Sequence, residues 1–303
     1  MPKVSVIIPT YNRAEFLRFA ITSVLNQTFQ DFEIIVVDDA SIDNTEDVVR
    51  SLSDKRISYF RHGANKGNAA TRNTGIRNSS GHYIALLDDD DEWLPSKLEK
   101  QVRLLDSSPP IVGGVYTGFV VIDKASGKMV ERVTPTKRGS IFNELLIQNW
   151  VGTSSTVLLR RECFDKVGLF DEGLASGVDY DMWIRIAKEF QFEFIEGPLV
   201  KYFNHENQLS NNYEIIIRGT EVMLKKYGHL FSLNSKLYSD RYLSLGVLYC
   251  HNNNVKKGRE AFLKAIKIYP LEIRHYFNFC LSLLGAANFR KLKELKEKVF
   301  RTT

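Results

Sequence analysis

The first 105 residues alternate between short apolar runs and segments with helical periodicity, and this alternation limits the fold more than any other feature of the chain. Each apolar run leads into a short polar loop and then into a segment with apolar residues at helical spacing. The runs that read as buried strands are residues 3–9, 33–37, 57–60 and 83–87. Strands and helices that alternate through short connections predict an α/β fold with a doubly wound, mostly parallel sheet.

The last of these runs stops abruptly in four consecutive aspartates, Asp88–Asp91. Carboxylates at the C-terminal end of a buried strand suit a hard divalent cation that also holds phosphate. An acidic run is more often a solvated loop, but the strand before it argues against that interpretation. A calcium-binding EF-hand is disfavoured because Trp93 occupies the position where that loop needs glycine. We interpret Asp88–Asp91 as a metal and nucleotide site.

Other polar residues follow the remaining strands at the same edge of the predicted sheet. They are Thr10, Asp39 and the segment 66–72. In doubly wound sheets the ligand crevice lies outside the carboxyl ends of the strands, so we expect these residues to lie near the aspartates. The first strand is not followed by Gly-x-Gly-x-x-Gly, and residues 63–67 lack the Gly-Lys-Ser/Thr ending of a P-loop. Dinucleotide enzymes and P-loop ATPases are therefore disfavoured.

From residue 111 onward the pattern changes. It predicts strands at 112–122, 129–133 and 156–159, a helix near 141–148, and a polar loop of small residues at 149–155. A further helix carries an apolar stripe and has Asp179 and Asp181 in its first turn. Both carboxylates could simply cap this helix. From the residues alone, capping and a chemical role are equally open.

Composition and cysteine usage indicate a globular intracellular protein. With 303 residues, of which 44% are hydrophobic, the chain can bury a sizeable core. Its three cysteines are far apart and have no metal-ligand spacing, which is typical of reduced cysteines in a cytosolic protein. No apolar stretch is long enough for a signal peptide or a membrane span. We expect a cytoplasmic location, with peripheral contact at the inner face of the cell membrane as an open alternative.

The net charge of +5 originates at the C-terminal end. Residues 221–303 contain 16 basic and 6 acidic side chains, a net charge of +10, whereas residues 1–110 and 111–220 have net charges of −3 and −2. This distribution argues against a general nucleic-acid binder. It favours a separate C-terminal module, one that could face an anionic surface.

Five segments of the chain resemble, in order, the motifs of the family-2 glycosyltransferases, which use nucleotide sugars and have the GT-A fold. They are Val6–Arg13, Val36–Ser41, Asn65–Asn73, Leu87–Trp93 and Asp179–Trp183. The resemblance covers residues 3 to about 212. It implies a transferase domain over residues 1–212, with a Rossmann-like nucleotide-sugar-binding half at 1–110 and an acceptor-binding half at 111–212.

The resemblance also implies which residues bind the donor. Thr10 and Asp39 would contact the base, Asp88 the ribose and Asp91 the sugar, while Asp89 would touch no ligand. Lys66 and Arg72 would approach the diphosphate or the sugar. The implied nucleotide-sugar-binding set is Thr10, Tyr11, Arg13, Asp39, Lys66, Arg72, Asp88 and Asp91.

A cofactor and a catalytic base follow from the same resemblance. Asp90 would bind Mn²⁺ or Mg²⁺ between the phosphates, and His205 would either touch the metal or be structural. Asp179 matches the base that removes the acceptor's proton while the anomeric centre is inverted. The family usually has an acidic residue before this aspartate, but Val178 is apolar, which leaves Asp181 as a fallback base. The implied acceptor side comprises Trp150, Thr153, Ser154 and Asp181.

These roles imply an inverting, metal-dependent glycosyltransferase of the hexosyltransferase type. It would move a sugar from a nucleoside diphosphate sugar, expected to be a UDP-sugar, to a hydroxyl of a glycan or lipid-linked acceptor in surface polysaccharide synthesis. The alternative is a catalytically inactive, transferase-like scaffold, against which the intact carboxylates argue. A Mg²⁺-dependent phosphotransferase would give the segments 9–13 and 38–39 no role.

Residues 213–303 are predicted to be helical, with the spacing of a tetratricopeptide repeat. The matching positions are Tyr242, Leu245, Gly246, Tyr249, Gly258, Phe262, Ala265 and Pro270. Glycine replaces the usual alanine at position 258, and Tyr276, Phe279 and Leu283 indicate a partial second copy 34 residues after the first. A plain antiparallel helical hairpin fits nearly as well. Such helices could bind a protein partner or self-associate.

Residues 288–300 alternate apolar and basic side chains and predict a basic amphipathic helix. This helix could lie on an anionic membrane or pack with its apolar side inward. We favour packing as its main role.

Overall fold

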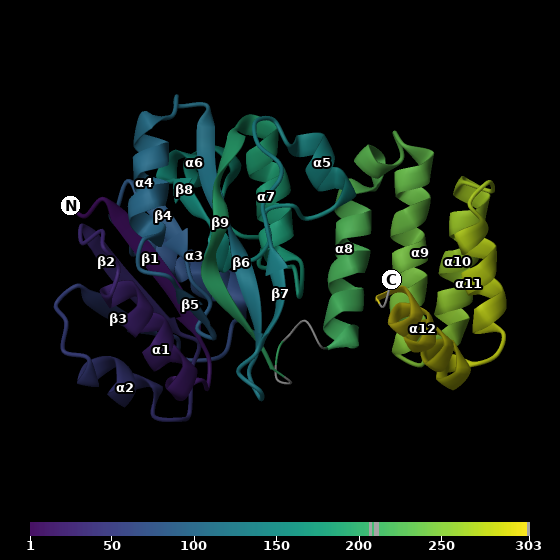
Figure 1. Ribbon diagram of the computed structural model, residues 1–303, viewed down its shortest axis with the longest axis horizontal. Coiled ribbons are helices and arrows are strands. Elements are labelled where there is room, and N and C mark those ends of the chain that lie inside the picture. Colours follow the sequence, from purple (N-terminus) through teal and green to yellow (C-terminus); the bar gives the residue numbers. More distant parts are fainter. Residues whose placement is uncertain (206–207, 209–211, 302–303) are drawn as a thin grey trace. The chain divides into compact units, whose positions relative to one another are not determined.

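The computed structural model describes residues 1–205, 208 and 212–301, with side chains up to Lys293 in the last helix (Figure 1). In this part of the chain, one nine-stranded sheet has the strand order β3-β2-β1-β4-β8-β6-β9-β5, and β7 pairs with β6. The chain forms two compact units. The first comprises Met1–Gly173 and Val178–Glu206, and the second comprises Leu174–Gly177 and Asn207–Thr303.

The four predicted apolar runs form the parallel part of the sheet. They are β1 (Val4–Thr10), β2 (Phe32–Asp38), β3 (Ile57–Arg61) and β4 (Tyr83–Leu86). β1 pairs in parallel with both β2 and β4, and β2 pairs in parallel with β3. All seven residues of β1 are buried, because both faces of the sheet are covered by helices.

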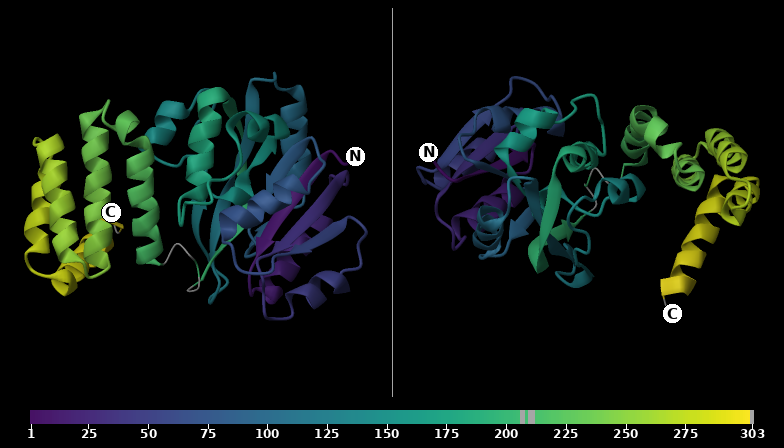
Figure 2. Two further views of the ribbon diagram at one scale, coloured as in Figure 1. Left: turned by 180° about the vertical axis from the view of Figure 1, so that it is seen from behind. Right: turned by 90° about the horizontal axis from the view of Figure 1, so that it is seen from above.

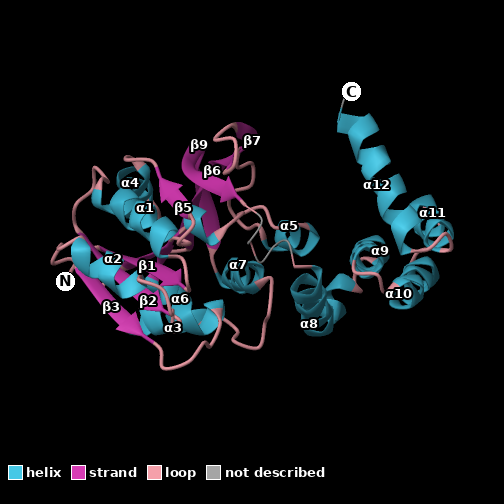
Figure 3. Cartoon of the chain, turned by 90° about the horizontal axis from the view of Figure 1, so that it is seen from below, coloured by secondary structure: helices cyan, strands magenta, loops and turns pink. Residues whose placement is uncertain are grey.

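Helices cover the two faces of this sheet (Figure 3). On one face, α1 (Ala14–Leu25) and α4 (Lys97–Ser107) share an apolar core with β1 and β2, and α2 (Thr45–Ser51) contributes Val49 to it. On the other face lies α3 (Asn68–Arg77). A Cβ atom at Gly75 of α3 would lie only 2.4 Å from the side chain of Ile7, so glycine permits the close approach of this helix to β1.

The second half of the sheet mixes strand directions. β8 runs antiparallel to both β4 and β6, while β6 and β9 are parallel. Sequence analysis did not anticipate β5, which pairs antiparallel with β9 and buries Trp93. The elements of this half are β5 (Asp91–Trp93), β6 (Val112–Asp123), β7 (Met129–Val133), α5 (Phe142–Ile147), η1 (Ser154–Thr156), β8 (Leu158–Arg160), α6 (Arg161–Val167), α7 (Val178–Glu189) and β9 (Gln191–Asn204).

The second unit is helical, as Figure 2 shows. Its helices are α8 (Tyr213–Phe231), α9 (Ser235–His251), α10 (Val255–Ile268), α11 (Ile273–Ser282) and α12 (Ala286–Arg301). The first predicted repeat corresponds to α9 and α10, which pack together and bury Leu245, Tyr249, Phe262 and Ala265. None of the described helices has both the length and the apolar character needed to cross a membrane.

The second repeat matches its predicted positions only in part, since Phe279 packs against the core formed by Cys250, Phe262, Leu281 and Phe289 but the other two positions do not. The buried positions of α11 are His275, Asn278, Leu281 and Ser282, whereas Tyr276 is 42% and Leu283 is 57% exposed. Polar side chains on this buried face bond their own helix, since Asn278 donates to the carbonyl of Arg274. An apolar pattern therefore could not locate the face.

The N-terminal part of α12 packs inward, with Phe289 fully buried and stacked on Phe262 at 6.2 Å between ring centroids. Leu292 is 41% exposed. The side chains beyond Lys293, including the predicted apolar positions 295 and 299, lie outside the described residues.

Candidate functional site

The four aspartates lie between the end of β4 and the start of β5, and their exposure differs. The side chain of Asp88 is 25% exposed and that of Asp90 is 10% exposed. Asp89 and Asp91 are buried, with 4% and 1% of their surface exposed. The amide of Asp91 donates to the carbonyl of Asp88, which closes a tight turn. The carboxylates are therefore not equivalent in their access to a ligand.

Asp89 binds residues that follow β1. Its carboxylate accepts hydrogen bonds from Thr10 Oγ1 at 2.7 Å and from Arg13 Nη1 at 3.1 Å. Burial and the neighbouring charge of Asp90 raise the pKa of Asp89 to about 7, against the opposing effect of Arg13 and Thr10. Thr10, expected at the nucleotide base, thus directs its hydroxyl to Asp89. The sequence offered no indication that Asp89 would bind Thr10 and Arg13, because in a run of identical residues nothing distinguishes one aspartate from the next.

Asp90 lies beside His205, which follows β9. Asp90 Oδ2 is 3.0 Å from His205 Nε2 and 2.6 Å from Arg13 Nη1, and the Asp90 and His205 side chains are each 10% exposed. A carboxylate oxygen and an imidazole nitrogen are ligands that Mn²⁺ accepts. Across the described ranges, no cluster of three or more His, Cys, Asp or Glu side chains could hold a metal ion. The pair therefore fits a cation that takes its remaining ligands from substrate phosphates and water.

Ser155 connects two of the aspartates, although its loop, residues 150–155, was expected only to line the acceptor side. Its hydroxyl donates to Asp91 Oδ2 at 2.6 Å and accepts from the amide of Asp88 at 3.1 Å, while its carbonyl accepts from Trp93 Nε1. Burial, followed by the charges of Asp90 and Asp88, raises the pKa of Asp91 well above its ordinary value. Asp91 was expected near the donor sugar, but the structure buries it against the 150–155 loop.

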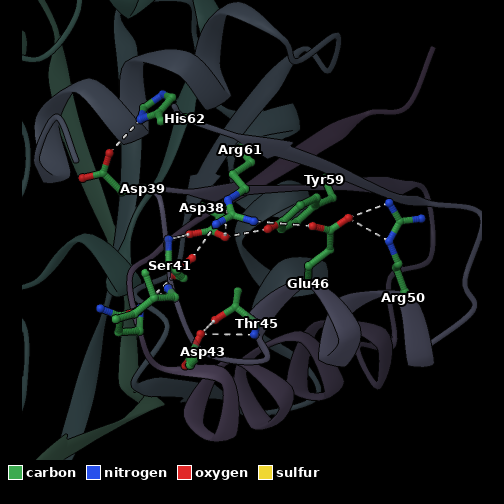
Figure 4. A network of polar contacts seen from close by, with 12 residues as sticks. Asp38, Asp39, Ser41, Asp43, Thr45, Glu46, Arg50, Tyr59, Arg61 and His62 are labelled. Carbon is green, nitrogen blue, oxygen red and sulfur yellow. Dashed lines mark hydrogen bonds and ion pairs between the residues drawn. The ribbon is translucent and has the colours of Figure 1, made fainter. Parts of the chain in front are cut away.

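Asp39 follows β2 and lies beside His62, which directly follows β3 (Figure 4). Its Oδ1 accepts from the amide of Lys66 at 2.8 Å and lies 2.7 Å from His62 Nδ1, and its Oδ2 accepts from the amide of Gly67 at 2.8 Å. His62 Nε2 in turn lies 2.9 Å from Thr74 Oγ1. Asp39 and Lys66 are thus brought together as predicted from their place at one edge, and His62 is an additional buried member of this group.

Arg72 of α3 joins two carboxylates from different parts of the sequence. Its Nη2 donates to Asp88 Oδ1 at 2.6 Å and its Nη1 donates to Asp179 Oδ1 at 3.0 Å. Burial raises the pKa of Asp88, an effect that Arg72 opposes and that the charge of Asp179 increases. The contact places Asp179, in the first turn of α7, beside the end of β4.

The predicted acceptor residues do not all reach this cluster. Asp181 is fully buried and forms an ion pair with Arg185 at 2.9 Å, so its carboxylate lies in the interior of the protein and not beside Asp88 and Asp179. Thr153 Oγ1 accepts from the amide of Ser155, and Ser154 is fully buried. Trp150 is partly buried, with Lys137 Nζ 5.1 Å from its ring centroid. Tyr11 is 45% exposed.

This geometry agrees with what sequence comparison finds. The family model described as glycosyl transferase family 2 matches residues 5–168, which is more than half of the chain. The chain therefore belongs to glycosyl transferase family 2 and contains a glycosyltransferase domain of that family. The predicted family and enzyme class are confirmed.

Curated relatives carry the same assignment. An uncharacterized glycosyltransferase of Rickettsia felis is 36% identical over 223 residues, which cover 70% of this chain but 36% of that protein. One from Rickettsia typhi is 37% identical, covering 69% of this chain and 66% of that protein. The UDP-Glc:alpha-D-GlcNAc-diphosphoundecaprenol beta-1,3-glucosyltransferase WfgD of Escherichia coli is 32% identical, with 69% and 80% covered. The chain thus spans only about a third of the R. felis relative.

Solved structures support the fold. Residues 1–349 of Staphylococcus aureus TarS in complex with UDP-GlcNAc match with a TM-score of 0.64 at 17% identity, covering 98% of this chain and 92% of that one. The mannosyltransferase PcManGT from Pyrobaculum calidifontis in complex with GDP-Man and Mn²⁺ matches with a TM-score of 0.55 at 17% identity, covering 98% and 88%. The predicted GT-A fold, followed by a helical region, is confirmed.

Proposed function

We propose that this glycosyltransferase inverts the anomeric centre as it moves a sugar from a UDP-sugar to a hydroxyl of a glycan or lipid-linked acceptor, with Asp179 as the base. The observation that carries the proposal is the position of Asp179. Asp179 lies in the second half of the first compact unit, which we call the transferase unit. The guanidinium of Arg72 nevertheless joins it to Asp88 at the end of β4. A base is thereby held beside the carboxylates expected to bind the donor.

Asp179 has the access that a general base needs. Its side chain is 29% exposed, and Arg72 bonds only Oδ1. Oδ2 has no protein partner among the residues that the structure describes. Proton transfer requires this oxygen to come within about 3 Å of the acceptor hydroxyl. As the hydroxyl oxygen bonds to the anomeric carbon and the nucleoside diphosphate leaves from the opposite face, Oδ2 takes the proton.

Asp90 and His205 would hold a Mn²⁺ or Mg²⁺ ion together with the donor's phosphates. When bound, such an ion offsets the charge that develops on the departing diphosphate. Arg13 contacts Asp90 Oδ2, the oxygen that also lies beside His205, and it donates to Asp89 as well. The bond to Asp89 would therefore keep Arg13 in place if Asp90 bound a cation.

The proposed donor and acceptor rest on relatives. The E. coli relative is named for UDP-Glc and an acceptor linked to diphosphoundecaprenol, and the TarS structure contains UDP-GlcNAc. The mannosyltransferase binds GDP-Man, so the donor base needs a direct test. We expect UDP with Mn²⁺ to raise the melting temperature more than GDP with Mn²⁺ in a thermal-shift screen, because at equal concentration the ligand that binds the folded protein more tightly stabilises it more. A screen in which no nucleotide binds would favour the inactive-scaffold alternative.

Substitution of Asp179 tests the chemistry. We expect Asp179→Asn to lower UDP release from UDP-Glc or UDP-GlcNAc by about 10²–10⁴-fold, with UDP affinity nearly unchanged. Calorimetry with UDP and Mn²⁺ measures the affinity. The matched control is Asp165→Asn, an exposed aspartate on α6 that should leave both values as they are. Unchanged turnover in Asp179→Asn would exclude Asp179 as the base.

A further inference from the structure

Arg72 has an unusual environment for a residue expected to meet a diphosphate. It is only 2% exposed, and the ring of Phe170 lies 5.5 Å from its guanidinium carbon. A charge buried to this extent is tolerated only where opposite charges and hydrogen bonds compensate it. Asp88 and Asp179 supply that compensation, at 2.6 and 3.0 Å. The side chain is thus enclosed by protein.

The two carboxylates occupy different nitrogen atoms of the guanidinium. Asp88 accepts from Nη2 and Asp179 accepts from Nη1. The guanidinium is planar and its donors have a fixed geometry, so two carboxylates bound in this way are held at a defined spacing and angle. A lysine ammonium is a point charge on a flexible stem and cannot impose that geometry.

Each carboxylate keeps one oxygen for a ligand. Both bonds to Arg72 use Oδ1, and the Asp88 and Asp179 side chains remain 25% and 29% exposed. In the described part of the chain, no hydrogen bond to Oδ2 of either residue is formed. Oδ2 of each residue is therefore available to a ligand, while Oδ1 is held by the buried arginine.

We propose that Arg72 is a positioning residue that fixes Asp179 relative to Asp88, and does not itself bind the diphosphate or the sugar. This inference rests on the proposed function of Asp179. It replaces the role expected for Arg72 from the family resemblance. The distance between the donor's ribose and the acceptor's proton then depends on one enclosed side chain, and small displacements at this point are costly because a misplacement of about 1 Å can lower the rate about 10²-fold.

The test separates affinity from turnover. In Arg72→Lys we expect UDP affinity in the presence of Mn²⁺ to change by less than about threefold, and UDP release from UDP-Glc or UDP-GlcNAc, with water as acceptor, to fall about 10–100-fold. Arg72→Gln is prepared in parallel. It retains one NH₂ donor group but lacks the positive charge. The melting temperature identifies which variant folds. If Arg72 instead binds the diphosphate, UDP affinity will fall by the same factor as turnover, and the inference is wrong.

Arg185→Lys is the matched control. Arg185 also pairs with an aspartate of α7, Asp181, but on the buried side of the helix. We expect it to reduce stability while turnover stays within about twofold of the wild type. An equal loss of turnover in Arg185→Lys would show that loosening α7 suffices, and would overturn the specific role of Arg72. Failure of Asp179→Asn to lower turnover would instead refute the proposed base, whatever the Arg72 variants do.

Discussion

Lys97 is fully buried at the start of α4, where its Nζ donates to Gln101 and lies 3.8 Å from the ring centroid of Trp93. Burial lowers the pKa of Lys97 well below its ordinary value. The unfolded chain therefore binds the extra proton, and stability rises with pH from the lowered pKa up to about 10.4. Relative to Lys97→Met, we expect the wild type to gain up to about 1.4 kcal/mol per pH unit in this window.

Urea unfolding between pH 8 and 10, followed by tryptophan fluorescence, measures this difference. Lys100→Met, an exposed lysine on the same helix, is the control and should leave the pH dependence of the wild type unchanged. If the free energy of unfolding changes with pH in the same way in the wild type and in Lys97→Met, Lys97 is charged in the folded protein.

Ser155 provides a second prediction at the scale of the residue. Its hydroxyl lies between the Asp91 carboxylate and the Asp88 amide, and the residue is fully buried. We expect Ser155→Ala to cost about 1–3 kcal/mol of unfolding free energy, because buried polar groups lose their partner. UDP affinity should stay close to that of the wild type, because the bond from Arg72 still holds the Asp88 carboxylate. A Ser155→Ala variant as stable as the wild type would show that the folded protein does not need this hydroxyl.

The choice between Asp179 and Asp181 could have been made from the sequence. Asp179 and Asp181 are two residues apart, and at about 3.6 residues per turn their side chains point to nearly opposite sides of a helix. Only one of them could face a ligand while the apolar stripe faced the core. The structure places Asp179 at the site and Asp181 in the interior. The partners of Asp39, in contrast, are backbone amides of a loop, and residue types carry no signal for them.

At the scale of the element, the pair of helices α9 and α10 explains the unusual glycine of the first repeat. A Cβ atom at Gly258 would lie 2.5 Å from Cys250 Sγ, so the cysteine fills the space that alanine would need. We expect Gly258→Ala to destabilise the helical unit by about 1–3 kcal/mol through overpacking. The double variant Cys250→Ala/Gly258→Ala should recover part of this loss.

Thermal unfolding followed by circular dichroism checks this prediction. The control is Gly228→Ala in α8, where the nearest atom to a new Cβ is 3.7 Å away. That substitution should stabilise, by about 1 kcal/mol, because alanine favours helix. If Gly258→Ala is as stable as the wild type, the cysteine must move aside at little cost.

Strands and helices were predictable where burial alone defines them. Each strand of the parallel half was visible as an apolar run, and β7 was predicted with the bounds that the structure shows. β5 and the antiparallel direction of β8 were not, because short strands acquire their partners only from distant segments. For α11, polar residues on the buried face concealed the register.

At the scale of the whole molecule, each unit has a hydrophobic core of its own. One core joins β1, β2, α1 and α4, and the other joins Cys250, Phe262, Leu281 and Phe289. Units with separate cores are expected to unfold separately. All three tryptophans, Trp93, Trp150 and Trp183, belong to the transferase unit. Fluorescence therefore reports that unit, and circular dichroism reports both.

We expect UDP with Mn²⁺ at about 100 times its dissociation constant to stabilise the fluorescence transition by about 2.7 kcal/mol. The unfolding transition of the helical unit is the one whose melting temperature falls in Gly258→Ala. The ligand should not change its melting temperature. A single transition that responds to both the ligand and Gly258→Ala would show that the two units unfold as one.

The pairing of the short strand β5 with β9 restricts insertions and deletions in the aspartate run. A chain that lost one of the four aspartates would still display an Asp-x-Asp motif, so the change would look silent to a motif search. Yet β5 would meet β9 shifted by one residue, and a one-residue slip turns every side chain of a strand to its opposite face. Trp93, now 3% exposed, would exchange its place with Glu92. The length of the run, and not only its composition, is therefore under structural constraint.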